Sequence, residues 1–267
     1  MRRSCALLAL AVATPAAAHR LDYADVLSPA PRLGYATLEI AEAPPPPVPF
    51  SAPAGPGGES GRVRSFFGDR FEIVPESDSY AWDISGEIGG PKHRLWLATA
   101  GSGTFGEGLD YVEGQVLYSH PVLDAGLALQ AGIRRDFVRP HRTYAVLGMQ
   151  GNATSPLYLG LFGFLSTQGE VTGRAYAYYD WEPAPRVVLQ PYAGLSASAE
   201  DIPALGLGRG LNSAELGLRL RYRIAEPFAP YVGLRYDRLL GRTADLAREA
   251  GDDVDAMAFL LGFRSYF

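Results

Sequence analysis

The chain ends with Val254-Asp-Ala-Met-Ala-Phe-Leu-Leu-Gly-Phe-Arg-Ser-Tyr-Phe267, a segment in which two kinds of side chain alternate. Large apolar side chains share one parity: Met257, Phe259, Leu261, Phe263 and Phe267. Small or polar residues share the other, with Leu260 and Tyr266 as exceptions: Ala256, Ala258, Gly262 and Arg264. Successive side chains of a strand point to opposite faces, so this pattern predicts a strand with one apolar face. A last strand of this kind, closed by an aromatic residue, is typical of bacterial outer-membrane barrels.

The beginning of the chain has the features of a secretory signal. Arg2 and Arg3 form a basic start, a short apolar stretch runs from Cys5 to Val12, and Ala16-Ala17-Ala18 is a small-residue cleavage site. The apolar stretch is too short to span a bilayer as a helix. We therefore expect residues 1–18 to be a signal peptide. The only cysteine lies inside it, so the mature chain would have neither a disulfide nor a thiol site.

Charge and composition narrow the class of protein further. Removal of residues 1–18, which contain two arginines and no acid, would change the formal net charge from −5 to −7. An acidic exported protein is a poor candidate for binding nucleic acid. After the signal there is no apolar run long enough for a membrane-spanning helix, whereas 15 Tyr, 12 Phe and 31 Gly favour strands and turns. An outer-membrane barrel fits these observations best.

Residues 19–62 differ in composition from the rest of the chain. They contain Pro44-Pro45-Pro46-Pro47 and Pro56-Gly57-Gly58. Proline removes backbone donors and such a segment cannot build a packed core, so we expect a disordered periplasmic arm or spacer. Residues 63–267 then form the barrel domain.

The barrel region divides into twelve candidate strands, most of them about ten residues long, which is the length a tilted strand needs to cross a bilayer. They are residues 66–75, 79–88, 93–102, 110–119, 124–137, 142–151, 157–166, 171–182, 186–199, 212–225, 228–239 and 254–267. An even number puts both ends of the barrel on the periplasmic side. The turns on that side are short, and residues 201–211 and 241–253 form long outer loops. The sequence therefore predicts an all-β fold, a transmembrane antiparallel up-and-down barrel of twelve strands.

Polar residues of the inward parity would line the lumen. The acids are Asp83, Glu87, Glu113, Glu215 and Asp237, and the bases are Arg94, Arg174, Arg219, Arg221, Arg235 and Arg264. One interpretation is a structural network of ion pairs that fills the lumen. The other is a charged path that selects small ions by electrostatics and width.

Histidines are the remaining candidates for chemistry. His93 and His120 fall at successive inner turns, so they are candidate neighbours in a metal site at the periplasmic rim. His141 lies near the outer end of the sixth strand, but no serine lies at a matching level on the strands beside it. A serine hydrolase needs such a pair in register, so we expect no enzymatic activity.

Several ordered stretches resemble the copper resistance protein B family of Gram-negative outer membranes, over residues 66 to 267. The stretches are Gly68-Asp-Arg-Phe-Glu72, Gly89-Gly90 followed by Arg94-Leu-Trp-Leu97, Val188-Leu-Gln-Pro191, Glu215-Leu-Gly-Leu-Arg-Leu-Arg-Tyr222, Phe228-Ala-Pro-Tyr-Val-Gly233, Gly241-Arg-Thr-Ala-Asp-Leu-Ala-Arg248 and Gly251-Asp-Asp-Val-Asp255. The resemblance implies an outer-membrane barrel that handles copper and cooperates with a periplasmic multicopper oxidase. Family members usually carry a Met- and His-rich arm, whereas residues 19–62 offer only His19.

Together these observations lead to one expected function and two alternatives. We expect a copper resistance or homeostasis protein that binds or passes copper ions through a charged lumen. Asp83, Glu87, Glu113, Glu215 and Asp237 would attract the cation, and His93 and His120 would form a weaker rim site. A small general porin, or a purely structural barrel without copper specificity, is the first alternative, and an outer-membrane hydrolase is the second.

Overall fold

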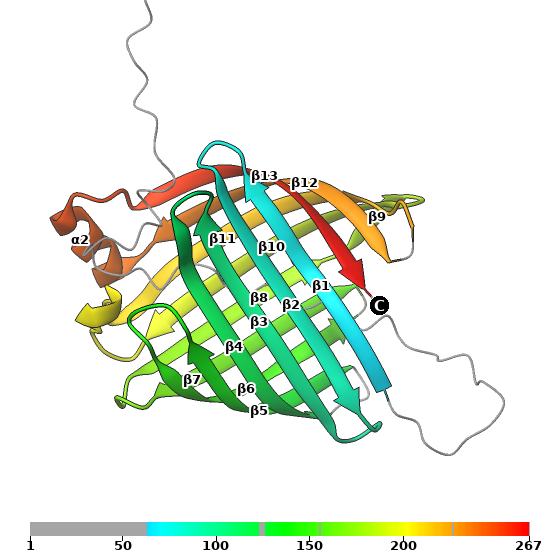
Figure 1. Cartoon of the computed structure of the whole chain (residues 1–267), viewed down its shortest axis with the longest axis horizontal. Helices are drawn as coiled ribbons and strands as arrows, with labels where there is room; N and C mark the ends of the chain where they lie inside the picture. The colour runs from blue at the N-terminus through cyan, green and yellow to red at the C-terminus, as the bar shows by residue number, and fades with distance from the viewer. Residues whose placement is uncertain (1–62, 123–125, 155, 226, 267) are drawn as a thin grey trace, which may run out of the picture.

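The computed structural model describes residues 63–122, 126–154, 156–225 and 227–266, which form a closed antiparallel barrel (Figure 1). The hydrogen-bonded order runs from β1 through β8, then through β10, β11, β12 and β13. The barrel closes where β13 pairs with β1 and where β11 pairs with β10. Residues 1–18, residues 19–62 and Phe267 lie outside the described residues, so the expected signal peptide and spacer remain expectations.

The strands are close to the predicted ranges. They are β1 (Val63–Val74), β2 (Ser79–Gly89), β3 (Arg94–Thr104), β4 (Gly108–Pro121), β5 (Leu127–Asp136), β6 (Thr143–Thr154), β7 (Leu157–Ser166), β8 (Val171–Tyr179), β9 (Trp181–Ala184), β10 (Val187–Ser198), β11 (Gly210–Tyr222), β12 (Phe228–Leu239) and β13 (Asp255–Tyr266). The short β9 pairs only with β10 and continues the line of β8 after Asp180. Residues 171–182, predicted as one strand, are therefore interrupted, and the closed ring contains twelve strands as predicted.

The two ends of the barrel differ. The first residues of β1 and the last residues of β13 lie at the same end, which we call the terminal end, and the turns there are short. The opposite end, the loop end, carries the two long connections. The predicted loop 241–253 contains the helix α2 (Gly241–Ala250), and the loop 201–211 contains the short helix η1 (Pro203–Leu205). Figure 1 shows α2 at the opposite end of the barrel from the C-terminus.

The predicted alternation decides which side chains face outward. On β13, Met257 is 71% exposed, whereas Leu260 is fully buried among inward residues. On β11, Leu216, Leu218 and Leu220 are exposed, while Glu215 and Arg219 are buried. The outer surface is therefore apolar and the interior is polar, as in transmembrane barrels. In the described part of the chain, no helix is long and apolar enough to cross a membrane.

A bulge breaks the alternation in β1. The pairing of β1 with β2 shifts its register between Gly68 and Arg70, and the pairing with β13 shifts between Gly68 and Phe71. Asp69 and Arg70 are consecutive in the sequence, yet both are buried. An extra residue in one strand lets two neighbouring side chains turn to the same face. The bulge thereby adds charges to the lumen that simple parity does not predict.

Candidate cation path in the lumen

All five acids predicted to face the lumen are buried inside the barrel. The exposed fraction of Asp83, Glu87, Glu113, Glu215 and Asp237 is at most 8%. They come from four strands, β2, β4, β11 and β12, and lie at different depths along the barrel. In the described residues, no group of three or more His, Cys, Asp or Glu side chains could hold a metal ion. The acids are therefore arranged along the lumen rather than gathered into one metal centre.

Glu113 of β4 is the centre of a cluster of paired charges. It accepts ion pairs from Arg134 at 2.8 Å and from Arg174 at 3.4 Å. Gln115 Nε2 donates to Glu113 Oε1 at 2.6 Å, and the hydroxyl of Tyr111 donates to Glu113 Oε2. A buried carboxylate is tolerated when it is paired and hydrogen-bonded in this way. Glu113 therefore holds three strands, β4, β5 and β8, together across the lumen.

A second cluster of charges surrounds Glu72 of β1. Arg219 Nε donates to Glu72 Oε1 at 2.9 Å, and Tyr231 donates to the same oxygen at 3.0 Å. The Arg219 guanidinium lies 4.0 Å from the ring centroid of Tyr192, in cation–π geometry. Arg70 approaches Glu72 at 3.7 Å. The predicted set of lumen residues did not include Glu72 and Arg70, because the bulge in β1 changes which positions of the strand face inward. In the sequence, Gly68 before Asp69-Arg70 is the local sign of this bulge.

The remaining predicted acids differ in their partners. Glu87 pairs with Arg94 at 2.6 Å, and Asp237 pairs with Arg235 at 2.9 Å. Glu215 lies directly across from Asp237 in the pairing of β11 with β12, so the two carboxylates share one face of adjacent strands. Most acids of the lumen are thus balanced by arginine, which supports the structural interpretation for much of the network.

One wall of the lumen is aromatic and apolar, which the sequence did not predict. A cluster of buried side chains from β3, β4, β6 and β7 consists of Trp96, Leu117, Tyr144, Val146, Phe162 and Phe164. The Arg134 guanidinium lies 4.9 Å from the Tyr144 ring centroid and 5.0 Å from that of Phe164. Side chains rather than water therefore fill much of this half of the barrel.

A cavity of about 40 Å³ lies against the aromatic wall. We call it the acidic cavity; it is lined by Asp83, Ser85, Trp96, Ala98, Ala100, Glu113, Gln115, Leu117, Gln130, Gln150, Phe162, Phe164, Arg174 and Tyr176. One water occupies on the order of 10–15 Å³ on this measure, so the space suits roughly three waters. Two carboxylates and three amide side chains face it against a single arginine. The lining therefore places several carboxylate and amide oxygen atoms around this space, those of Glu113 being bonded to neighbouring side chains.

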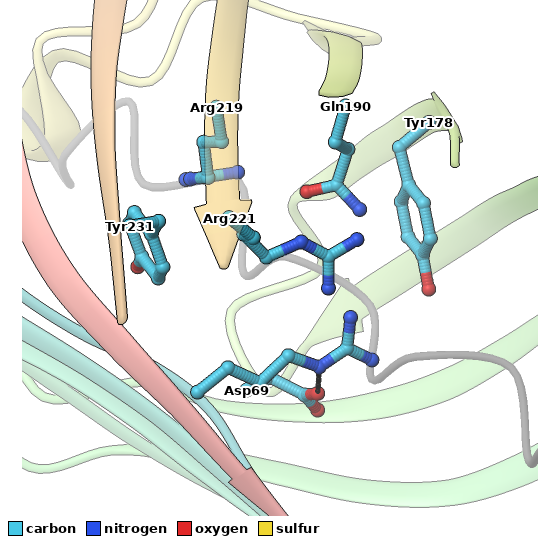
Figure 2. A pocket seen from close by; sticks show the side chains of 7 residues that line it. Asp69, Tyr178, Gln190, Arg219, Arg221 and Tyr231 are labelled. Atoms are coloured by element: carbon cyan, nitrogen blue, oxygen red, sulfur yellow. Dashed lines mark ion pairs between the residues drawn. The ribbon is translucent and has the colours of Figure 1, made fainter. Parts of the chain in front are cut away.

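A smaller cavity of about 10 Å³ has the opposite character. We call it the arginine cavity; it is lined by Asp69, Tyr178, Gln190, Arg219, Arg221, Tyr231 and Arg264. Figure 2 shows Arg221 between Gln190 and Asp69, and its dashed line marks the ion pair of Asp69 with Arg264 at 3.5 Å. Arg221 also pairs with Asp180. The narrow space is edged by guanidinium groups, and each of them has a carboxylate partner.

His93 and His120 are neighbours, as predicted, with ring centroids 5.4 Å apart. Their place in the fold differs from the predicted one. His120 belongs to strand β4 rather than to a turn, and it shares the outward parity of Tyr118, which is 48% exposed. Ser119, which lies between Tyr118 and His120 in the sequence, is buried and faces inward. The two histidines therefore lie on the outer wall of the barrel at the terminal end, outside the lumen.

Comparison with known proteins identifies similar chains. Residues 62–267 match the family model described as "Copper resistance protein B precursor (CopB)". Copper resistance protein B of Escherichia coli is 37% identical over 72% of this chain and 64% of its own length, so the match spans less than two thirds of that relative. The copper resistance protein B homolog of Pseudomonas syringae pv. tomato is 38% identical over 77% of this chain and 70% of its own length.

Solved structures that align with this chain include two porins. The NanC porin structure aligns with a TM-score of 0.48 and 15% identity, over 76% of this chain and 99% of that chain. The KdgM porin aligns with a TM-score of 0.45 and 12% identity, over 77% of this chain and 99% of that chain.

Proposed function

We propose a function for this chain on the premise that it belongs to the copper resistance protein B family. It is an outer-membrane barrel that protects cells against copper, and it does so by passing copper ions through its lumen. The acidic cavity is the observation that carries this proposal. Asp83 and Glu113 line it together with three glutamine amides. Glu113 is paired with Arg134 and Arg174, so Asp83 and the amide oxygens would be the groups that meet the ion. Both ends of the described chain would then face the periplasm, and the apolar outer wall would contact lipid.

The size of the acidic cavity bears on how an ion would pass. A space for roughly three waters does not admit an ion with its full hydration shell. Carboxylate and amide oxygens would replace part of that shell, as the oxygens of a selectivity filter do. Copper(II) binds most N, O and S sites more tightly than other divalent first-row ions do, but oxygen ligands hold it less firmly than imidazole or thiolate. Weak binding along Asp83, Glu87, Glu113, Glu215 and Asp237 favours passage over storage.

The proposed partners follow from the same premise. They are outer-membrane lipid, copper ions and a periplasmic multicopper oxidase, with no nucleic acid. We propose a non-enzymatic role, in which the lumen acids attract and conduct the ion and carry out no bond-breaking step.

The test uses a double variant, Asp83→Asn with Glu215→Gln, in cells challenged with copper. Both changes keep side-chain shape and remove one negative charge each, so the barrel should fold and copper protection should be lost. The matched control is Glu107→Gln with Asp253→Asn, which removes the same charges from exposed positions at the loop end. Copper protection should survive in the control. Protection that is unchanged in the double variant, at equal amounts of folded barrel, would remove the lumen acids from the mechanism.

A small general porin is the second candidate, and the arginine cavity favours it. Three guanidinium groups and one carboxylate line this narrow space, and a lining with more positive than negative charge would slow a bare cation and admit anions. Under this alternative, the reversal potential across a planar bilayer with a potassium chloride gradient would report chloride preference, and copper would pass no faster than magnesium. Faster passage of copper would decide against it.

A further inference from the structure

The outer wall at the terminal end carries a small group of rings outside the lumen. His93 and His120 lie 5.4 Å apart by ring centroids, and Tyr118 lies 5.9 Å from His93 and 6.4 Å from His120. The cross-strand neighbours of this group are apolar and exposed: Leu95 faces Tyr118, and Leu129 faces His120. The group therefore lies where an apolar belt meets the aqueous end of the barrel, a position that suits amphipathic rings.

Each imidazole is oriented by a hydrogen bond at its own Nδ1 atom. His120 Nδ1 lies 2.7 Å from the carbonyl oxygen of Lys92, which can only accept, so Nδ1 carries the proton. His93 Nδ1 is hydrogen-bonded to the hydroxyl of Tyr118. No hydrogen bond of either Nε2 atom occurs in the described part of the chain. A histidine that binds a metal almost always has its second nitrogen held by a carbonyl, carboxylate or water, which is the arrangement of His120.

The spacing of the two rings agrees with a shared metal ion. Imidazole nitrogens bind such ions at about 2.0 Å. Two imidazoles on one ion would have ring centroids roughly 4.5 Å apart in adjacent positions of the square-planar geometry that copper(II) prefers, and roughly 5 Å apart at a tetrahedral angle. Imidazole is a preferred ligand of copper, nickel and zinc, and copper(II) ranks highest among them for a given site. Lys92 next to His93 is exposed, and the neighbouring Arg94 is occupied inside the barrel by Glu87. One nearby ammonium group would weaken the site without blocking it.

We propose that His93 and His120 form a two-imidazole copper(II) site on the outer wall of the barrel, with Tyr118 as a positioning residue. The identity of the ion as copper rests on the proposed function, whereas the site itself rests on the geometry. Two protein ligands leave the other coordination positions to water or to an incoming ligand, since no third His, Cys, Asp or Glu of the described residues completes a group. Such an open site suits capture and transfer of copper at the periplasmic surface, not storage.

The test is a titration of copper(II) against the full chain, purified in detergent without a polyhistidine tag. Because His19 is another imidazole, every protein is also made with His19→Ala. Electron paramagnetic resonance should show copper coupled to two nitrogens, and the double variant His93→Ala, His120→Ala should lose this signal. Tyr118→Phe should weaken binding by about 10–100-fold, the effect expected for removing an outer-shell partner. His141→Ala, a lone histidine at the loop end, is the matched control and should bind as before.

Each outcome decides the proposal separately from the lumen mechanism. An unchanged two-nitrogen signal in the double variant would overturn the site, as would a chain that binds no copper in the His19→Ala background. Loss of the signal in the double variant, with the control unchanged, would support it. The two-histidine site can be supported even if copper protection in cells is unchanged, because these variants leave the lumen acids intact. The lumen acids are tested by their own substitutions.

Discussion

The acidic cavity and the arginine cavity lie in one lumen but have opposite surroundings. The acidic cavity of about 40 Å³ lies against the aromatic wall of β3, β4, β6 and β7, and Asp83 and Glu113 face it. The arginine cavity of about 10 Å³ lies among β1, β8, β10, β11, β12 and β13, and Arg219, Arg221 and Arg264 edge it. The two cavities show that charged side chains in a barrel can have a structural role and a role toward ions. Paired charges hold the strands together, and under the proposed function the small remaining space between them would set which ions pass.

The largest expected effect breaks the charge cluster beside the acidic cavity. Glu113→Gln removes the carboxylate that lies between Arg134 and Arg174, both of which are then left with less compensation inside the barrel. Loss of one partner of a buried ion pair costs about 3–5 kcal/mol. We expect the free energy of unfolding in urea, measured on the barrel in detergent, to fall by this amount. Glu107→Gln is the control, and a stability equal to that of the unchanged chain would show that Glu113 is not structural.

A smaller effect is expected from the arginine cavity. Arg219→Met keeps an apolar stem against Tyr192 and removes the charge-assisted hydrogen bonds to Glu72. Glu72 would still have Arg70 as a partner at 3.7 Å. Hydrogen bonds to charged groups contribute about 1.5–3 kcal/mol, so stability should fall by less than in Glu113→Gln.

Arg219→Met also tests whether ions pass beside the arginine cavity. Removing one guanidinium from the narrow point should shift the reversal potential in a potassium chloride gradient toward cation preference. Arg242→Met, an exposed arginine of α2, serves as the control. An unshifted potential would mean that ions do not pass beside Arg219.

The smallest expected effect concerns an ion pair at the loop end, outside the lumen. Partial burial would raise the pKa of Glu170, but hydrogen bonds from Arg142 and Ser166 outweigh it and lower the pKa below its usual value. A lowered pKa stabilises the fold above the ordinary glutamate pKa of about 4.3. This contribution is lost as the pH falls through the folded-state pKa.

The measurement compares the unchanged chain with Glu170→Gln across pH. The difference in free energy of unfolding between them should be present at pH 7 and disappear once the pH lies below the lowered folded-state pKa of Glu170. A difference that is the same at both pH values would exclude ionisation of Glu170 as its source.

The strands were predictable because alternation is a local property of the chain. Residues 157–166 and 228–239 have the predicted bounds, and the faces of β11 and β13 follow parity. The bulge at Gly68 to Arg70 was not predictable from parity, since one extra residue reverses the faces beyond it. The helix α2 was hidden in a predicted loop, although Ala244 and Ala247, three residues apart and both buried, are a sign of a helical face.

The site was predictable in part for a similar reason. The inward positions of Asp83, Glu113 and Glu215 follow from strand parity, so the sequence identified them. Their partners depend on pairs far apart in the sequence, such as Arg219 with Glu72, which no local pattern encodes. The contact of His93 with His120 followed from the adjacency of their strand ends, but the outward direction of His120 depends on where β4 ends.

Under the proposed function, copper ions pass through the lumen beside the acidic cavity. The most direct measurement is copper(II) uptake into lipid vesicles that contain the full chain, followed with a copper-sensitive dye trapped inside. We expect uptake with the unchanged chain and with the Glu107→Gln, Asp253→Asn control, and markedly slower uptake with Asp83→Asn, Glu215→Gln. Equal uptake in all three, or no uptake above protein-free vesicles, would contradict passage along the lumen acids.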